Sequence, residues 1–340
     1  MAKKIRLQIV LVAGLLLGLS STASALGWGD RSTGYLYEKL FNNMGERYLS
    51  LLEDKATDNP NNLAPDKRSI CLKRYGGILN DGVLDIRIAL GYFDWTTGSN
   101  VGYSGRSYGL SPSMDIGAFE ALKELLTSRC SGNARFCGFQ QSSEGSSVFV
   151  RDVMIHGRRI QARVEIRFSS QSEILSDNLG RYREQQRQRT QYMENYFSKA
   201  LREADAVFYF GHSRNGGGPD FAPPVFIGST NKLDYSGYYK AQRPGFKKML
   251  NALSSGSKQA PVLGLMSCAS RDHFLSRTRA AAPNSGIITS MDVLNVDEVY
   301  TAMIGGVDAL LRGQCQQSFY QSIRMTNNNQ KFITMDGMFE

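Results

Sequence analysis

The chain of 340 residues carries 40 Lys and Arg against 31 Asp and Glu, which gives a formal net charge of +9 at pH 7. This length is ample for a sizeable core, either as one large domain or as a domain with a helical appendage. The cations are dispersed and no nucleic-acid recognition pattern is present, so the composition argues against a nucleic-acid partner.

Residues 1–25 have the layout of a secretory signal peptide. The cations of "KKIR" precede the apolar run "LQIVLVAGLLLGL", and "ASA" at 23–25 supplies a small-residue cleavage site. A membrane anchor needs about 18–20 apolar residues, more than this run holds. We therefore expect an exported protein, periplasmic or extracellular, with no membrane span after signal removal. Loss of the three leader cations lowers its formal charge from +9 to +6.

Residues 26–82 are predicted to form an N-terminal helical extension and a loop. Apolar side chains in 33–54 fall on one helical face, and the polar run "DKATDNPNNLAPDK" follows them. Residues 83–340 are predicted to form one α/β domain. It begins with a strand in "VLDIRIALGYFDW", followed by a loop rich in Gly, Ser and Tyr at 96–113 and a helix in "MDIGAFEALKELLTSRC".

The middle of the chain predicts a hairpin and then a long helix. The alternation in "SSVFVRDVMIHGRRIQARVEIRFSS" predicts a β-hairpin insertion at about 147–170, turning at His156-Gly157. Apolar residues at helical spacing predict a helix within the arginine-rich stretch Arg181 to Glu203. Its arginines are most simply a solvated outer face, and a partner-binding surface is the alternative.

The last third alternates strands with helices. The apolar runs "AVFYF", "APVLGLM" and "SGIITSM" are separated by the helical segments "GFKKMLNAL" and "SRDHFLSRTRA", and "VDEVYTAMIGGVDALLRG" follows as a third helix. Short apolar runs between helices indicate a parallel sheet covered on both faces. The fold class is therefore predicted to be α/β, with a mostly parallel sheet flanked by helices.

The chain has five cysteines, an odd number, so at least one thiol has no intramolecular partner. An exported chain meets an oxidising compartment in which cysteines tend to pair. Cys130 and Cys137 could close a small loop within "CSGNARFC". The sequence does not indicate which of Cys71, Cys268 and Cys315 form a disulfide, and all five cysteines could also be reduced and buried.

The stretch "VFYFGHSRNGGG" admits a serine-hydrolase interpretation. A nucleophile elbow needs small residues on both sides of the serine and a helix immediately after it. Gly211 fits before Ser213, but Asn215 occupies the second glycine position and "GGGPDFAPP" breaks helices. The only later histidine is His273. The context therefore argues against Ser213 as a nucleophile.

A cysteine and histidine pair is the stronger prediction. His212 follows the strand "VFYF", and Cys268 follows "VLGLM" at the end of what we expect to be the neighbouring strand. Functional groups collect beyond the carboxyl ends of parallel strands, so both side chains should emerge on the same edge of the sheet. A thiol needs a base or a positive neighbour to become a useful thiolate, and an imidazole is the usual one.

These blocks resemble the caspase-like cysteine peptidases, the superfamily that includes caspases, legumain, gingipain, separase and the CHAT peptidases. "YFGHSRNGGG" and "LGLMSCAS" are similar to the separase and CHAT forms of the two blocks, in which one apolar strand ends in His-Gly and the next in the catalytic Cys. The tail "VDEVYTAMIGGVDALLRG" resembles the helix that closes a CHAT domain. The resemblance covers about 206–313 well and the strand at 83–93 weakly.

The resemblance implies a role for each matching residue. Cys268 would be the nucleophile and His212 the general base and acid, and the backbone N–H groups of Ser213 and Cys268 would hold the oxyanion. Ser213 departs from the usual glycine, which puts activity in doubt if the backbone there needs glycine. Three substrate-binding residues are also predicted: Asp94, which would favour Arg or Lys before the cleaved bond, Gly216 and Gly217.

Three classes of function therefore remain open. One is an exported cysteine endopeptidase that acts on a protein or peptide substrate without a cofactor or metal. The second is a non-catalytic binding or scaffolding protein on the same fold. The third is a surface-binding protein that acts through its arginine-rich helix. No zinc spacing and no phosphate-binding loop is present. His156 is interpreted as a hairpin turn residue and His273 as structural.

Overall fold

The computed structural model describes residues 37–94, 100–103, 105–110, 112–230, 232–234, 236–237, 242–326 and 329–340. The predicted signal peptide at 1–25 lies outside these residues. Within them, no helix combines the length and the apolar character that a bilayer crossing requires.

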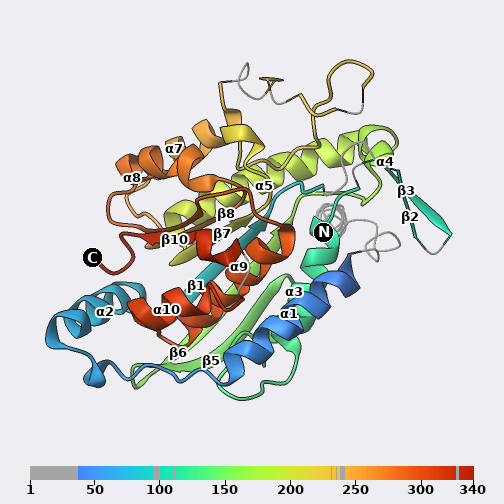
Figure 1. Ribbon diagram of the computed structural model, residues 1–340. Helices are drawn as coiled ribbons and strands as arrows, with labels where there is room; N and C mark the ends of the chain where they lie inside the picture. Colours follow the sequence, from blue (N-terminus) through green and yellow to red (C-terminus); the bar gives the residue numbers. More distant parts are fainter. Residues whose placement is uncertain are drawn as a thin grey trace, which may run out of the picture.

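An eight-stranded, mostly parallel sheet runs through the described part of the chain (Figure 1). Its order is β10-β9-β8-β7-β1-β6-β5-β4, and the five strands from β9 to β6 are parallel to their neighbours. β10 is antiparallel at one edge, and β5 and β4 are antiparallel at the other. The predicted α/β class is confirmed. The strands of this sheet are β1 Val83–Leu90, β4 Gln140–Gln141, β5 Val148–Ile155, β6 Arg158–Phe168, β7 Ala206–Phe210, β8 Val262–Met266, β9 Gly286–Ser290 and β10 Ile333–Asp336.

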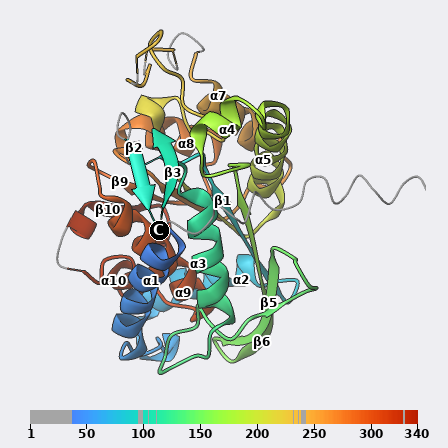
Figure 2. The same cartoon turned by 90° about the vertical axis from the view of Figure 1, so that its right-hand side faces the viewer.

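Helices cover both faces of the sheet (Figures 1 and 2). One face packs against α1, α3 and α9, with α2 and α10 beside them, and the other packs against α5, α7 and α8. The helices are α1 Glu38–Glu53, α2 Pro65–Ile78, α3 Asp115–Thr127, α4 Leu175–Leu179, α5 Arg183–Glu203, α7 Pro244–Ser255, α8 Ser276–Ala281, α9 Val296–Leu311 and α10 Gln316–Ser322. Smaller elements are the hairpin β2 Asn100–Tyr103 and β3 Arg106–Leu110, the 3-10 turns Pro60–Asn62, Arg214–Gly216 and Asn329–Phe332, and the π-turn Arg271–Leu275.

The apolar runs of the central strands are explained by burial on both sides. In β7, Phe208 and Phe210 enter the core under α1 and α9, whereas Val207 and Tyr209 enter the core under α5 and α7. Successive side chains of a strand point to opposite faces, so a strand covered twice has no polar positions. The same pattern holds in β8, which is buried at all of its residues.

The hairpin forms part of the main sheet. β5 and β6 pair as predicted and turn at His156 and Gly157. However, β6 also lies parallel to β1 along the whole of β1, from Val83 opposite Gln161 to Leu90 opposite Phe168. Alternation reveals a hairpin, but it does not say which third strand the hairpin joins.

The segment before β1 is integrated into the core. In α1, Phe41 and Tyr48 are 0% and 1% exposed and belong to the same cluster as the sheet residues. α2 is also attached covalently, because Cys71 forms a disulfide with Cys315 at the start of α10. The helix predicted at 33–54 is confirmed from Glu38 onward, whereas α2 was not anticipated.

Candidate functional site

The strand ends bring His212 and Cys268 to the same edge of the sheet. β7 and β8 are parallel neighbours, with Phe210 opposite Met266. His212 and Cys268 each follow two residues beyond that pair. The expectation that these two strands are adjacent is therefore confirmed.

Each side chain contacts a residue of the core cluster under α1 and α9. The ring of His212 packs edge-on against Phe93, with 4.5 Å between ring centroids. The thiol of Cys268 donates to the carbonyl oxygen of Leu294 at 3.5 Å. Phe93 and Leu294 both belong to the core cluster under α1 and α9, so the site lies at that cluster's edge. His212 and Cys268 are both half-buried.

The imidazole of His212 is held by the segment after β1. Its Nε2 lies 2.7 Å from the carbonyl oxygen of Asp94 and 3.2 Å from Asp94 Oδ1. A carbonyl oxygen only accepts, so Nε2 carries the proton in this contact. Among the described residues no hydrogen bond reaches Nδ1, which leaves that nitrogen for proton transfer.

A buried guanidinium holds Asp94 in turn. Arg214 Nη2 lies 3.1 Å from Asp94 Oδ1, and Nε lies 3.3 Å from Asp220 Oδ2. The side chains of Arg214 and Asp94 are both 0% exposed. Arg214 Nη2 also donates to the carbonyl oxygen of Tyr92 at 3.1 Å. Burial raises the pKa of Asp220, and Arg214 opposes this rise.

This placement bears on the predicted substrate contact of Asp94. An acid that selects Arg or Lys must present its carboxylate to the substrate, and this carboxylate is enclosed by protein and already faces Arg214 and His212. The geometry favours a positioning role for Asp94. The sequence reasoning missed Arg214, because nothing in "GHSRN" indicates that this arginine is buried.

The loop after His212 is tightly folded. The hydroxyl of Tyr209 donates to the carbonyl oxygen of His212 at 2.9 Å. A Cβ at Gly211 would lie 2.6 Å from that hydroxyl, so only glycine fits between them. Arg214 and Asn215 have φ values of 47° and 51°, in the left-handed region that non-glycine residues rarely adopt. Such positions persist only where the surrounding contacts enforce them.

Ser213 does not need to be glycine. Its φ of −72° and ψ of −15° lie in the right-handed region open to every L-residue. Among the described residues, neither the N–H of Ser213 nor that of Cys268 donates to the backbone carbonyl of another residue, and the Cys268 N–H contacts its own thiol.

Gly216 and Gly217 are buried inside the loop. Their N–H groups donate to the carbonyl oxygens of Ser213 at 3.0 Å and Arg214 at 2.9 Å. The carbonyl oxygen of Gly217 accepts from Phe246. These contacts argue against the predicted substrate contact at either glycine and favour a structural role.

Cys268 is the free cysteine of the five. Burial raises the pKa of its thiol, and the carboxylates of Asp292 and Glu298 act in the same direction. In this conformation the thiol is therefore protonated near neutral pH. Within the described part of the chain, Cys268 Sγ makes no hydrogen bond with His212.

The remaining candidates take structural positions. Ser213 is 6% exposed and is followed by one 3-10 turn, not by the helix that a nucleophile elbow requires. His273 lies in the π-turn Arg271–Leu275 and packs beside Phe274. His156 sits in the hairpin turn at a φ of 48°, and its Nε2 lies 2.6 Å from the carbonyl oxygen of Gly313.

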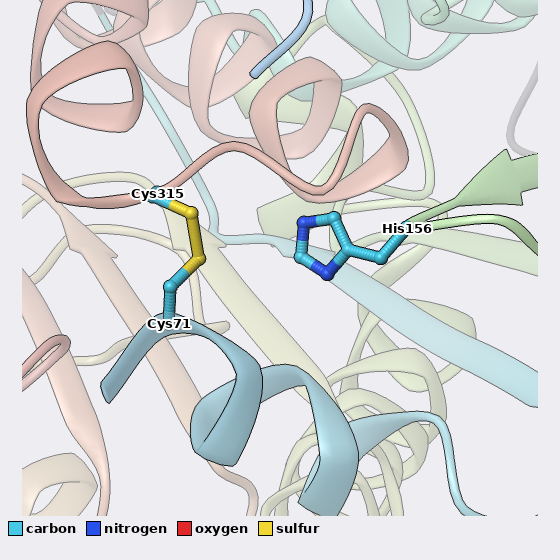
Figure 3. A group of neighbouring side chains, drawn as sticks. All are labelled: Cys71, His156 and Cys315. Atoms are coloured by element: carbon cyan, nitrogen blue, oxygen red, sulfur yellow. A yellow bond between two sulfur atoms is a disulfide. The ribbon is translucent and has the colours of Figure 1, made fainter. Parts of the chain in front are cut away.

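His156 belongs to a group of three possible metal ligands (Figure 3). Ligand atoms of Cys71, His156 and Cys315 lie within 4.8 Å of one another. The two sulfurs are bonded to each other, however, so neither is the thiolate that a metal ion requires. This group is a disulfide with an adjacent imidazole. The Cys130–Cys137 disulfide closes the small loop that the sequence suggested.

Comparison with known proteins returned no matching family model, no matching curated protein and no matching solved structure.

Proposed function

We propose that this protein is an exported cysteine endopeptidase with a caspase-like fold. The observation that carries the proposal is the placement of its free cysteine. Cys268 and His212 follow adjacent parallel strands at equivalent positions, while the other four cysteines are paired with one another. An imidazole oriented through Nε2 and an unpaired thiol at neighbouring strand ends are the two groups that nucleophilic catalysis by cysteine needs.

The reaction begins when the thiol of Cys268 turns from the Leu294 carbonyl toward His212. Nδ1 takes the thiol proton as Sγ attacks a peptide carbonyl, and the N–H groups of Ser213 and Cys268 stabilise the oxyanion. His212 then gives the proton to the leaving amine, and the C–N bond breaks to leave a thioester. Water, deprotonated by the same imidazole, hydrolyses the thioester and restores the thiol.

Asp94 and Arg214 act on this reaction by holding the imidazole. Nε2–H donates to the Asp94 carbonyl oxygen, which stabilises the imidazolium formed during attack and fixes the tautomer. Catalytic hydrogen bonds are often long or poorly aligned before substrate binds, so the present Cys268 contact with Leu294 is compatible with this role.

A non-catalytic binding or scaffolding protein on the same fold is the second candidate. Two observations favour it: the thiol is satisfied by the Leu294 carbonyl, and burial raises the pKa of Cys268. On this alternative, the paired strand ends are a remnant of catalysis and the edge of the sheet serves only to bind.

Labelling of the native, oxidised protein with iodoacetamide separates the two candidates. A peptidase predicts alkylation of Cys268 that His212→Ala slows by at least tenfold, because the imidazole generates the thiolate. The matched control is His273→Ala, which removes another half-buried histidine and should leave the rate unchanged. Equal rates in the wild-type protein and His212→Ala would end the proposal.

Peptide hydrolysis is then measured on a mixed peptide library by mass spectrometry. Cleavage products that disappear with Cys268→Ala and with His212→Ala support the peptidase. Absence of cleavage, together with a Cys268 labelling rate that His212→Ala leaves unchanged, supports the scaffold.

A further inference from the structure

The two disulfides differ in the charged groups that contact their cysteines. Cys130 and Cys137 are joined across a loop with a sequence separation of 7, next to the edge strands β4 and β5. Cys71 and Cys315 are joined across a separation of 244, between α2 and α10. Cys130 is half-buried, whereas Cys137, Cys71 and Cys315 are 3%, 1% and 4% exposed.

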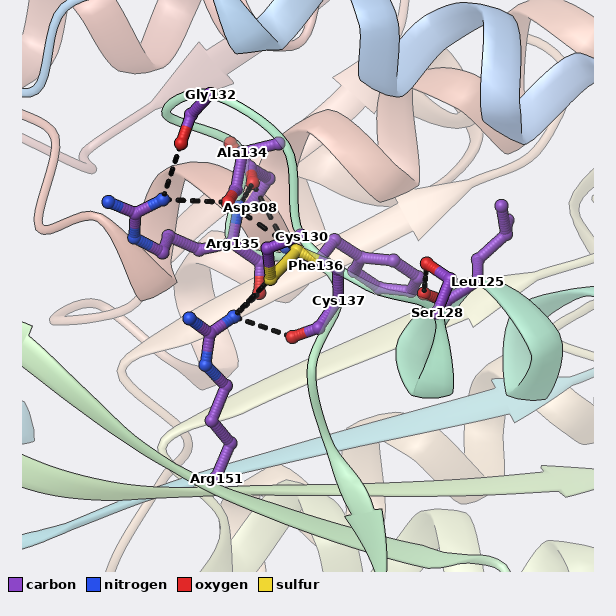
Figure 4. The surroundings of a disulfide bond; sticks show 10 residues. All are labelled: Leu125, Ser128, Cys130, Gly132, Ala134, Arg135, Phe136, Cys137, Arg151 and Asp308. Carbon is purple, nitrogen blue, oxygen red and sulfur yellow. Dashed lines mark hydrogen bonds between the residues drawn. A yellow bond between two sulfur atoms is a disulfide. The ribbon is translucent and has the colours of Figure 1, made fainter.

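Arg151 of β5 contacts the sulfur of Cys130 (Figure 4). Its Nη1 lies 2.9 Å from Cys130 Sγ and 3.7 Å from Cys137 Sγ. Gly138, with a φ of 66°, permits this approach, because a Cβ there would lie 3.1 Å from Cys130 Sγ and 3.4 Å from Arg151 Nη1. A disulfide sulfur is a weak acceptor and a thiolate a strong one, so this contact strengthens when the S–S bond is reduced.

The charge of Arg151 is not neutralised by a contacting carboxylate. Its partners in the described residues are the two sulfurs and the carbonyl oxygens of Arg135 and Cys137. The carboxylate of Asp308 raises the pKa of Arg151 from a distance, but Asp308 itself pairs with Arg312 at 2.6 Å. A thiolate at Cys130 would therefore become the nearest counter-charge of this guanidinium.

The Cys71–Cys315 disulfide has no such cation. In the part of the chain that the structure describes, no guanidinium or ammonium hydrogen-bonds either sulfur. The N–H of Cys315 donates to Asp58 Oδ2 at 2.8 Å, which places a carboxylate beside this disulfide. Burial lowers the pKa of His156 and keeps that ring neutral. A nearby carboxylate opposes thiolate formation and so favours the disulfide.

A cavity of about 260 Å³ lies against Cys137. Its lining includes the carboxylates of Glu46, Glu53 and Glu124. With Arg129 also in the lining, the cavity is negative overall, which disfavours glutathione more than a dithiol whose only charge is its attacking thiolate.

We propose that Cys130–Cys137 is a thiol–disulfide exchange site for dithiols and that Cys71–Cys315 is the structural disulfide. The thiolate of the dithiol attacks Cys137 Sγ from the cavity, the protein S–S bond breaks, and Cys130 leaves as a thiolate facing Arg151. The second thiol loses its proton to solvent and displaces Cys137, which takes up a proton. Two electrons reduce the protein disulfide, and the dithiol becomes a disulfide.

The exchange is local, because other contacts hold the loop after reduction. The N–H groups of Arg135 and Phe136 donate to Asp308 Oδ1 at 2.5 and 3.1 Å. The N–H of Gly138 donates to the carbonyl oxygen of Ser128 at 2.7 Å. Reduction of this disulfide therefore leaves the sheet and its helices folded.

The test equilibrates the native protein in buffers of reduced and oxidised dithiothreitol, followed by acid quenching, alkylation and peptide mapping of each cysteine. We expect Cys130–Cys137 to be half-reduced in a buffer at least about tenfold more oxidising than the one that half-reduces Cys71–Cys315, which is about 30 mV for a two-electron couple. This comparison needs no variant. Simultaneous reduction of both disulfides, or earlier reduction of Cys71–Cys315, would overturn the proposal.

A variant then tests the role of the guanidinium. Arg151→Met should shift the Cys130–Cys137 equilibrium at least about fivefold toward the disulfide without moving Cys71–Cys315. The matched control is Arg135→Met. It removes a cation from the same loop, and within the described residues Arg135 Nη1 donates to the carbonyl oxygens of Gly132 and Ala134 and to neither sulfur. An unchanged equilibrium in Arg151→Met, or an equal shift in Arg135→Met, contradicts the assigned contact.

Discussion

The Nε2–H group of His212 donates to the backbone carbonyl oxygen of Asp94 over 2.7 Å. This bond joins the ends of two neighbouring strands, β7 and β1, and leaves Nδ1 as the nitrogen that can exchange a proton. A main-chain acceptor is fixed by the fold itself, so the imidazole keeps its orientation as long as the segment after β1 keeps its place. Arg214 secures that segment through the Asp94 carboxylate and the Tyr92 carbonyl.

Arg214→Met should be strongly destabilising. It leaves the carboxylates of Asp94 and Asp220 without their cation, and breaking a buried ion pair in this way costs about 3–5 kcal/mol. The free energy of unfolding, measured in urea, should fall by that amount. Arg187→Met is the control, because this arginine is 65% exposed and its loss should leave the stability unchanged. Equal stabilities of the two variants would show that the buried pair does not hold the loop.

Ser213→Gly should neither restore nor raise reactivity. The backbone of Ser213 is already right-handed, so glycine gains nothing there and only increases the freedom of the unfolded chain. We expect the free energy of unfolding to fall by about 0.5–1 kcal/mol and the iodoacetamide labelling rate of Cys268 to stay within twofold. A large increase in the labelling rate would mean that serine at this position restrains the thiol.

Asp115 should make stability depend on pH in the mildly acidic range. Burial raises the pKa of this carboxyl from 3.8 to about 6, although Ser169 and Ser170 donate hydrogen bonds to it. The folded state therefore holds this proton more tightly than the unfolded state. The resulting stability is fully present below about pH 4 and is lost as pH rises through about 6.

The Asp115→Asn variant isolates this effect, because the amide oxygen can still accept from the two backbone N–H groups. The stability of the wild-type protein relative to the variant should fall by on the order of 2–3 kcal/mol between pH 4 and pH 7. Urea denaturation of both proteins across this range measures the difference. A difference that does not vary with pH would contradict the raised pKa.

The two disulfides should contribute unequally to stability. On the chain-entropy account, a bridge across a separation of 244 stabilises by about 5 kcal/mol and one across a separation of 7 by about 2–3 kcal/mol. Replacing both cysteines of one pair by alanine, with the other pair intact, should show this order in urea denaturation. The reverse order would mean that strain or residual structure outweighs loop length.

Much of the fold could be predicted because buried parallel strands are continuous apolar runs. β7, β8 and β9 are each buried throughout, and the helices between them show one apolar face. α2 escaped prediction because its buried residues, Cys71, Tyr75 and Ile78, stand among many charged ones. The pairing of the hairpin strand β6 with β1 could not be predicted from the sequence either, because pairing between strands that are distant in the chain leaves no local sequence pattern.

In the candidate site, too, some residues could be predicted from the sequence and others could not. His212 and Cys268 could be placed because strand ends are visible in sequence. The positioning of Asp94 depends on Arg214, whose burial is decided by distant groups such as the Tyr92 carbonyl and Asp220. The pairing of Cys71 with Cys315, which identified Cys268 as the free thiol, also follows only from the tertiary structure.

The bond between α2 and α10 encloses the whole sheet except β10 within one covalent ring. A cut in the exposed segment 225–230 would therefore leave two fragments that still migrate as one species on a non-reducing gel. They would separate only after this buried bridge is opened. Nicking of the chain and dissociation of its pieces are thus distinct events in this molecule.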